Sequence, residues 1–153
     1  MTKSPIVTVV ISLALLCLGV VGYKLGGRTL STANMVPLSP CDPGSGTCRV
    51  SIPQGGELVF SLEPRPIRPL QKLTLTAITQ GLPTSGIEVD FDGVDMSMGY
   101  NRVRLSGENG HFSGQAILPV CITGNMKWKA TVLIEAGNGQ TIAITFHFDI
   151  AGR

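Results

Sequence analysis

The sequence predicts an all-β fold, namely an immunoglobulin-like antiparallel β-sandwich preceded by one N-terminal transmembrane helix. Three observations lead to this prediction. The first residues form a long apolar run, and after residue 48 apolar and polar residues alternate along short stretches. The 153 residues also include 19 glycines and 10 prolines, which favours tight turns between short strands. No helical period is sustained beyond the apolar run.

Residues 5–23 are predicted to form a membrane anchor. The run from Ile6 to Tyr23 carries no charged residue. A helix of that length reaches about 27 Å, which is roughly the hydrocarbon thickness of a bilayer. Ser4 can cap the helix, and Pro5 suits its first turn. The sequence therefore predicts contact with a membrane through one N-terminal helix.

A cleaved signal peptide is the alternative interpretation of this run. Small residues allow cleavage after Gly22 or after Ala33. The run is longer than a usual signal-peptide core, which favours the anchor. Orientation does not follow from charge, because Lys3 precedes the run while Lys24 and Arg28 follow it.

The cysteine spacing indicates an oxidising compartment. Cys41 and Cys48 enclose a turn-forming Asp-Pro-Gly-Ser-Gly-Thr stretch, within a predicted linker of residues 24–47. We expect these cysteines to form a disulfide, which requires a location outside the cytoplasm. Two free thiols or half of a zinc site are the alternatives, although a second ligand pair is missing. We expect an inner-membrane protein with residues 29–153 outside the cytoplasm, which is the periplasm if the source is a Gram-negative bacterium.

Residues 48–153 form the predicted sandwich domain. Residues 63–70 include three prolines and are expected to be an extended edge segment. Residues 107–110 and 137–139 have the composition of hairpin turns. Strands are predicted at residues 49–52, 57–62, 73–77, 87–91, 103–105, 112–118, 128–134 and 142–150.

Charge and motif content exclude several classes of function. Three of the 12 basic residues lie in or beside the anchor, so the remainder is nearly neutral and lacks a basic stripe for nucleic acid. Glu88, Asp90 and Asp92 alternate with apolar residues and are predicted to face solvent rather than calcium. No hydrolase, phosphate-loop or zinc-protease motif is present, so we predict that the protein is not an enzyme.

Sulfur-containing residues form the candidate metal-binding set. Met96 and Met98 are separated by one residue, and an extended chain would project both thioethers to one side. Cys121 is left without a partner by the predicted disulfide, and Met126 follows it. Soft sulfur ligands select Cu(I) over hard ions, and His111 could add a nitrogen ligand. His147 alternates with phenylalanines and is expected on the outer face. Core packing is the competing explanation for these methionines.

The order of motifs in the second half resembles the YtkA-like and FixH-like domains of bacterial envelope proteins. The similarity covers roughly residues 70–150 and consists of short motifs: Met-x-Met-Gly, Gly-His-Phe, Leu-Pro and Gly-x-Met-x-Trp. The resemblance implies a small, often membrane-tethered β-sandwich associated with copper handling or with assembly of haem-copper oxidases. Cys121 in the Leu-Pro turn departs from the wider group.

Two functions therefore follow as expectations. The first is binding or relay of Cu(I), in connection with respiratory oxidase assembly, through Met96, Met98, Cys121, Met126 and His111. The alternative is a non-metal interaction module that steadies a membrane complex through a protein partner in the envelope. Convergence of the sulfur atoms at an accessible surface would favour the first.

Overall fold

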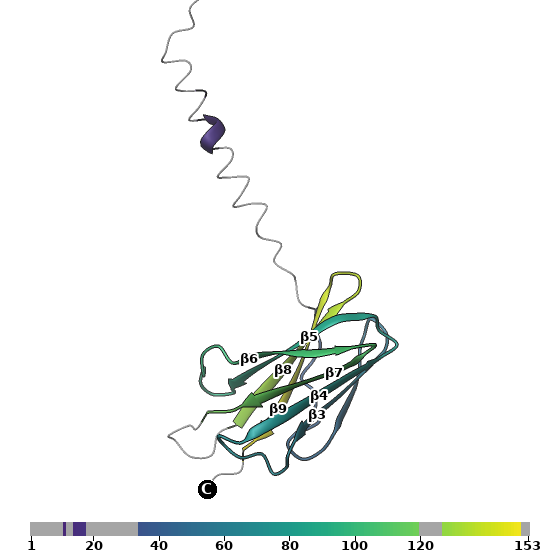
Figure 1. Cartoon of the computed structure of the whole chain (residues 1–153), viewed down its shortest axis with the longest axis vertical. Coiled ribbons are helices and arrows are strands. Elements are labelled where there is room, and N and C mark those ends of the chain that lie inside the picture. Colours follow the sequence, from purple (N-terminus) through teal and green to yellow (C-terminus); the bar gives the residue numbers. More distant parts are fainter. Residues whose placement is uncertain (1–10, 12–13, 18–33, 120–126, 151–153) are drawn as a thin grey trace, which may run out of the picture. The chain divides into compact units, whose positions relative to one another are not determined.

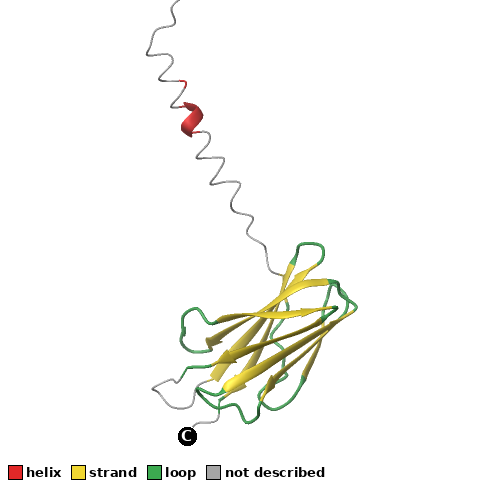
Figure 2. Cartoon of the chain, viewed as in Figure 1, coloured by secondary structure: helices red, strands yellow, loops and turns green. Residues whose placement is uncertain are grey.

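Eight antiparallel strands and one short parallel strand form the domain (Figures 1 and 2). The computed structural model describes residues 11, 14–17, 34–119 and 127–150. The chain divides into two compact units, Met1–Ser31 and Thr32–Arg153. The strands are β1 (Asn34–Met35), β2 (Cys48–Ser51), β3 (Glu57–Glu63), β4 (Lys72–Gln80), β5 (Thr84–Gly93), β6 (Arg102–Glu108), β7 (His111–Ile117), β8 (Lys127–Ala136) and β9 (Thr141–Asp149).

The N-terminal unit is described only at residue 11 and residues 14–17, which are helical. Most of the predicted anchor, residues 5–23, lies outside the described residues. Among the residues that are described, no helix has the length and apolar character needed to cross a membrane.

The strands belong to one curled sheet with the order β1-β9-β8-β5-β6-β7-β4-β3-β2. The prediction of an all-β antiparallel fold is confirmed, whereas the structure has one continuous sheet in place of two separate ones. Strand β6 joins the two parts of the sheet, because its first half pairs with β5 and its second half pairs with β7. A side chain at Gly107 would collide with the backbone of His111, so glycine permits the close approach of β6 and β7 there.

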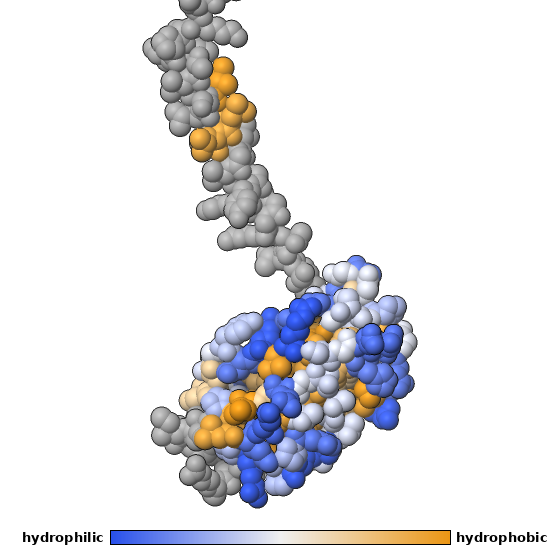
Figure 3. Space-filling model, in the orientation of Figure 1, coloured by the Kyte–Doolittle hydropathy of each residue, from blue (hydrophilic) through white to orange (hydrophobic). Residues whose placement is uncertain are grey.

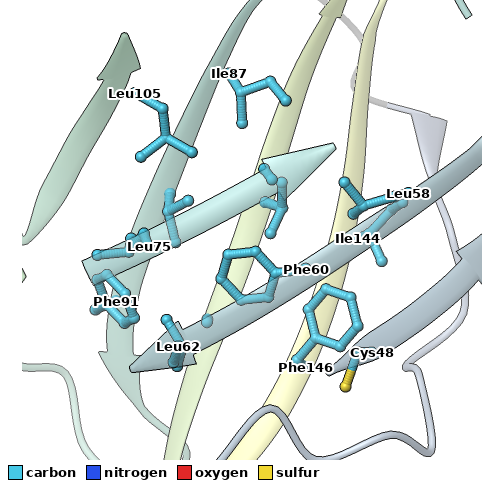
Figure 4. Close-up of a cluster of buried hydrophobic side chains, with 14 of the residues drawn as sticks. Cys48, Leu58, Phe60, Leu62, Leu75, Ile87, Phe91, Leu105, Ile144 and Phe146 are labelled. Atoms are coloured by element: carbon cyan, nitrogen blue, oxygen red, sulfur yellow. The ribbon is translucent and has the colours of Figure 1, made fainter. Parts of the chain in front are cut away.

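Curling brings strands from distant parts of the sheet against each other in a shared core. The rings of Phe60 on β3 and Phe146 on β9 stack with centroids 5.3 Å apart (Figure 4). Phe91 meets Phe148 edge to face at 6.3 Å. Trp128 is 1% exposed. The buried positions alternate along β4 and β8, as the sequence pattern predicts, and along β9 apart from Ala143, which is buried as well.

Residues 34–48 connect the two edges of the curled sheet. Strand β1 pairs in parallel with β9, and Ser39 forms a further bridge with Phe146. The predicted disulfide between Cys41 and Cys48 is confirmed, and Cys48 begins the opposite edge strand, β2. The later part of the predicted linker 24–47 is therefore attached to the domain. The disulfide fastens the segment that lies along one edge to the strand that forms the other.

Loss of this disulfide is expected to destabilise the domain. Replacing both Cys41 and Cys48 with alanine should lower the free energy of unfolding by about 2.5 kcal/mol, because the unfolded chain regains the freedom of the short closed loop. Urea unfolding of the full chain measures the effect. Cys17→Ala is the matched control, since Cys17 is a free cysteine. Equal stability of the double variant and the parent would show that the disulfide does not hold the edges.

Candidate metal centre

The loop of residues 94–101, between β5 and β6, carries two of the predicted ligands. Its ends are fixed to neighbouring strands by backbone hydrogen bonds. Val94 N donates to the carbonyl oxygen of Lys127 at 3.0 Å, and Phe91 N donates to the carbonyl oxygen of Asn101 at 2.9 Å. Gly93, the last residue of β5, is the register partner of Trp128 on β8. The loop is therefore anchored to the start of β8 and to the end of β5.

Met96 and Met98 have different environments within this loop. Met96 is 45% exposed, whereas Met98 is partly buried against the hydrophobic core. Residues 94–96 form a bend and the rest of the loop is not strand. Met96 and Met98 are therefore not part of a strand, although both lie in the same loop. Met96 therefore presents its side chain to solvent, unlike a methionine that serves only to fill the core.

The backbone of Met98 is held on both sides. Its N–H donates to Asp92 Oδ1 at 2.7 Å. Its carbonyl oxygen accepts a hydrogen bond from Asn101 Nδ2 at 2.9 Å. These contacts fix the position of Met98 relative to the end of β5. No pattern in the sequence predicts this role of Asp92. Its alternation with apolar residues indicates only that it lies on the outer face of the strand.

Asp92 is a structural carboxylate with three partners. Besides Met98 N, it accepts from Gly93 N at 3.0 Å and forms an ion pair with Lys129 Nζ at 3.3 Å. The hydrogen bond from Met98 lowers the pKa of Asp92 below its ordinary value, assisted by Lys129 and Gly93 and opposed by desolvation. Asp92 therefore stays ionised at neutral pH and holds the loop.

Asp92 is expected to make stability depend on pH. Because its pKa is lower in the folded protein than in the unfolded chain, its contribution is complete above the unfolded value of about 3.8 and is lost as pH falls through the folded value. Asp92→Asn should be less stable than the parent at neutral pH, and the difference should vanish in acid. Thermal unfolding across pH measures this, with Asp95→Asn in the same loop as control. A difference that persists in acid would contradict the assignment.

His111 lies at the other end of β6 from the methionines. It pairs with Glu108 across the hairpin, whereas the methionine loop leads into Arg102. The intervening strand spans about 20 Å at roughly 3.3 Å per residue. The structure therefore does not bring His111 to Met96 and Met98. His147 pairs with Lys129 on the sheet and is partly exposed, in agreement with its predicted outer position.

Cys121 and Met126 lie outside the described residues. Their flanks are described: β7 ends at Ile117, and β8 begins at Lys127. Lys127, which follows Met126 in the chain, is hydrogen-bonded to Val94 at the start of the methionine loop. The described parts of the chain contain no group of three His, Cys, Asp or Glu residues that could hold a metal. Among the described residues, the predicted ligands that share one loop are therefore the thioethers of Met96 and Met98.

Comparisons with known proteins do not assign a family. No family model and no curated protein matches the chain. Among solved structures, the crystal structure of an engineered protein is similar to part of it, with a TM-score of 0.46 and 11% sequence identity. The similar region covers 65% of this chain and 21% of the engineered protein. A similarity this weak supports no inference about the fold or the function of this chain.

Proposed function

We propose that the domain binds Cu(I) at the loop of residues 94–101, with Met96 and Met98 as thioether ligands. The observation that carries the proposal is the exposure of Met96, at 45%, two positions before a methionine whose backbone is fixed at both sides. The thioether of an exposed methionine, in a loop whose backbone is held in place, is accessible to a metal ion. Thioether sulfur is a soft ligand that suits Cu(I) rather than zinc or calcium.

Cys121 and Met126 complete the proposed ligand set. Support comes from the hydrogen bond between Val94 and Lys127, because Met126 is covalently joined to Lys127 and Val94 is two residues from Met96. His111 is omitted from the site because it lies at the opposite end of β6. We propose a binding role without catalysis.

The proposed setting is the bacterial envelope. Residues 5–23 would anchor the protein in the inner membrane, and the domain would lie in the periplasm. The disulfide between Cys41 and Cys48 supports an oxidising compartment. The resemblance to YtkA-like and FixH-like domains supports an immunoglobulin-like fold for this domain. It also supports a role in delivering copper to a respiratory oxidase.

A reporter fused after Arg153 is expected to reveal the compartment. Alkaline phosphatase, which needs disulfides, should be active there, whereas a reporter that folds only in the cytoplasm should be inactive. The reason is that the disulfide of this domain and those of the reporter need the same oxidising environment. Activity of only the cytoplasmic reporter would contradict the proposed topology.

Competition for Cu(I) tests the proposed binding directly. The full-length protein is titrated anaerobically into Cu(I) held by a chromogenic chelator, with its disulfide intact. We expect the protein to withdraw one equivalent of copper and to leave zinc with a zinc-selective chelator. Failure to withdraw copper would overturn the proposal.

A non-metal interaction module is the second candidate. One observation favours it: the end of the domain that carries the methionine loop also exposes Leu70, Tyr100 and Ile117, at 61%, 82% and 59%. Leu70 is linked to this end by a hydrogen bond from its N–H to the carbonyl oxygen of Leu118. An apolar surface of this kind suits a protein partner. A chain that binds no copper would leave this function as the better account.

A further inference from the structure

The two methionines of the loop of residues 94–101 differ in how far a dissolved oxidant can reach them. Met96 is 45% exposed, and its neighbours Asp95 and Ser97 are exposed as well. The loop projects from the domain between β5 and β6 and forms part of its surface, where polar and apolar residues are mixed (Figures 1 and 3). Met98 is partly buried and packs against the hydrophobic core. Met96 therefore presents the more accessible side chain.

The thioether of an exposed methionine reacts with peroxides. A sulfur lone pair attacks one oxygen of hydrogen peroxide, the O–O bond breaks and an S–O bond forms, so that the thioether becomes a sulfoxide. The peroxide takes up the electron pair that sulfur loses, and its other oxygen leaves as water. Methionine sulfoxide reductases reverse the oxidation with electrons from a dithiol, and the products are the thioether, a disulfide and water. Oxidation of an exposed methionine is therefore reversible.

The fold is expected to tolerate a sulfoxide at residue 96. Oxidation of a methionine disrupts a core because an apolar side chain becomes polar. Met96 is already in contact with water, so the new oxygen can be hydrated. The loop is anchored by the hydrogen bonds of Val94 with Lys127 and of Met98 with Asp92. Neither contact involves a methionine sulfur, so both should persist after oxidation.

A sulfoxide at residue 96 would remove a ligand from the proposed copper site. Its oxygen is a hard donor in place of the soft thioether sulfur, and Cu(I) selects soft ligands. Met98 is shielded by its packing against the core and keeps its thioether. The affinity for Cu(I) should therefore fall while the loop stays in place.

We propose that Met96 is a peroxide-sensitive switch of the copper site: its oxidation to the sulfoxide releases Cu(I), and its reduction restores binding. This inference rests on the proposed function and adds a means of regulating the same site. Exposure alone does not make such a switch. Met35 is 85% exposed, but it lies on β1 and pairs with Ala143, away from the loop. A sulfoxide at Met35 should therefore leave copper binding unchanged.

The order of oxidation is measured on the full-length protein without copper. The protein is exposed to hydrogen peroxide for increasing times, and peptide mapping by mass spectrometry reads the sulfoxide at each methionine. We expect Met96 to be oxidised at least about fivefold faster than Met98, because susceptibility follows exposure. Oxidation of Met98 as fast as that of Met96 would overturn the proposal.

The Cu(I) competition assay, applied before and after peroxide treatment, measures the consequence. Arsenite is added after the peroxide, because it returns any sulfenic acid at Cys121 to the thiol and leaves sulfoxides in place. The affinity of the parent should fall at least about tenfold once Met96 is oxidised, and methionine sulfoxide reductases should restore it. Peroxide should cause no further loss in folded Met96→Leu, whereas Met35→Leu should lose as much affinity as the parent.

The outcomes separate the switch from the copper site itself. Undiminished copper binding by a parent whose Met96 is oxidised would overturn the switch alone. An equal loss of affinity in Met96→Leu would assign the loss to another sulfur and would overturn the switch as well. Failure of the untreated parent to bind Cu(I) would overturn the proposed function, and the switch with it.

Discussion

Phe146→Ala is expected to lower the free energy of unfolding by about 3–5 kcal/mol, which is the usual cost of removing a buried phenylalanine. Phe146 is fully buried and stacks on Phe60 with ring centroids 5.3 Å apart. Its strand, β9, and that of Phe60, β3, lie near opposite ends of the strand order. The substitution therefore removes buried apolar surface, and it also removes a contact that holds the curled sheet closed.

Chemical unfolding of the full chain measures this loss. Ile117→Ala serves as the control, because Ile117 is 59% exposed and its truncation should change stability by no more than about 0.5 kcal/mol. If Phe146→Ala cost no more than the control, the packing between β3 and β9 would not contribute to closing the sheet.

Replacing both Met96 and Met98 with leucine is expected to lower the affinity for Cu(I) by at least about 100-fold. Changes around metal ligands typically cost 10–100-fold, and this variant removes two ligands outright. The fold should survive, because a methionine-to-leucine exchange nearly conserves volume and usually costs under about 1.5 kcal/mol. The change in copper affinity is thus separated from a change in stability.

Met35→Leu provides the matched control for this experiment. Met35 is 85% exposed, but it lies on β1 and pairs with Ala143, far along the sheet from the methionine loop. It should leave the Cu(I) affinity unchanged in the same competition assay. Equal copper affinity in the folded double variant and the parent would exclude Met96 and Met98 as ligands.

Much of the strand content could be predicted from alternation alone. The alternating residues Ile142, Ile144 and Phe146 are all buried on β9, as predicted, although Ala143 between them is buried too. The hairpin after Gly107 also follows the prediction, since Asn109 and Gly110 both have positive φ, at 55° and 79°. Local chemistry determines these features, so a single sequence contains the information.

Pairing between distant segments could not be predicted in the same way. The attachment of β1 to β9 depends on a backbone edge that no local pattern specifies. Whether strands form two sheets or one depends on a single strand, β6, that pairs on both sides. The contact of Asp92 with Met98 likewise joins residues through a loop conformation. Met96 and Met98 could be assigned to one loop from the sequence, because they are near neighbours in the chain. Separating His111 from that loop required the register of strands β6 and β7.

X-ray absorption at the copper edge of the loaded full-length protein tests the central claim most directly. The proposal predicts a first coordination shell of sulfur alone, with fewer sulfur scatterers in the Met96→Leu, Met98→Leu double variant and an unchanged spectrum in His111→Ala. A shell of nitrogen or oxygen ligands, or a spectrum that the double variant does not alter, would contradict a thioether site for Cu(I) in the loop of residues 94–101.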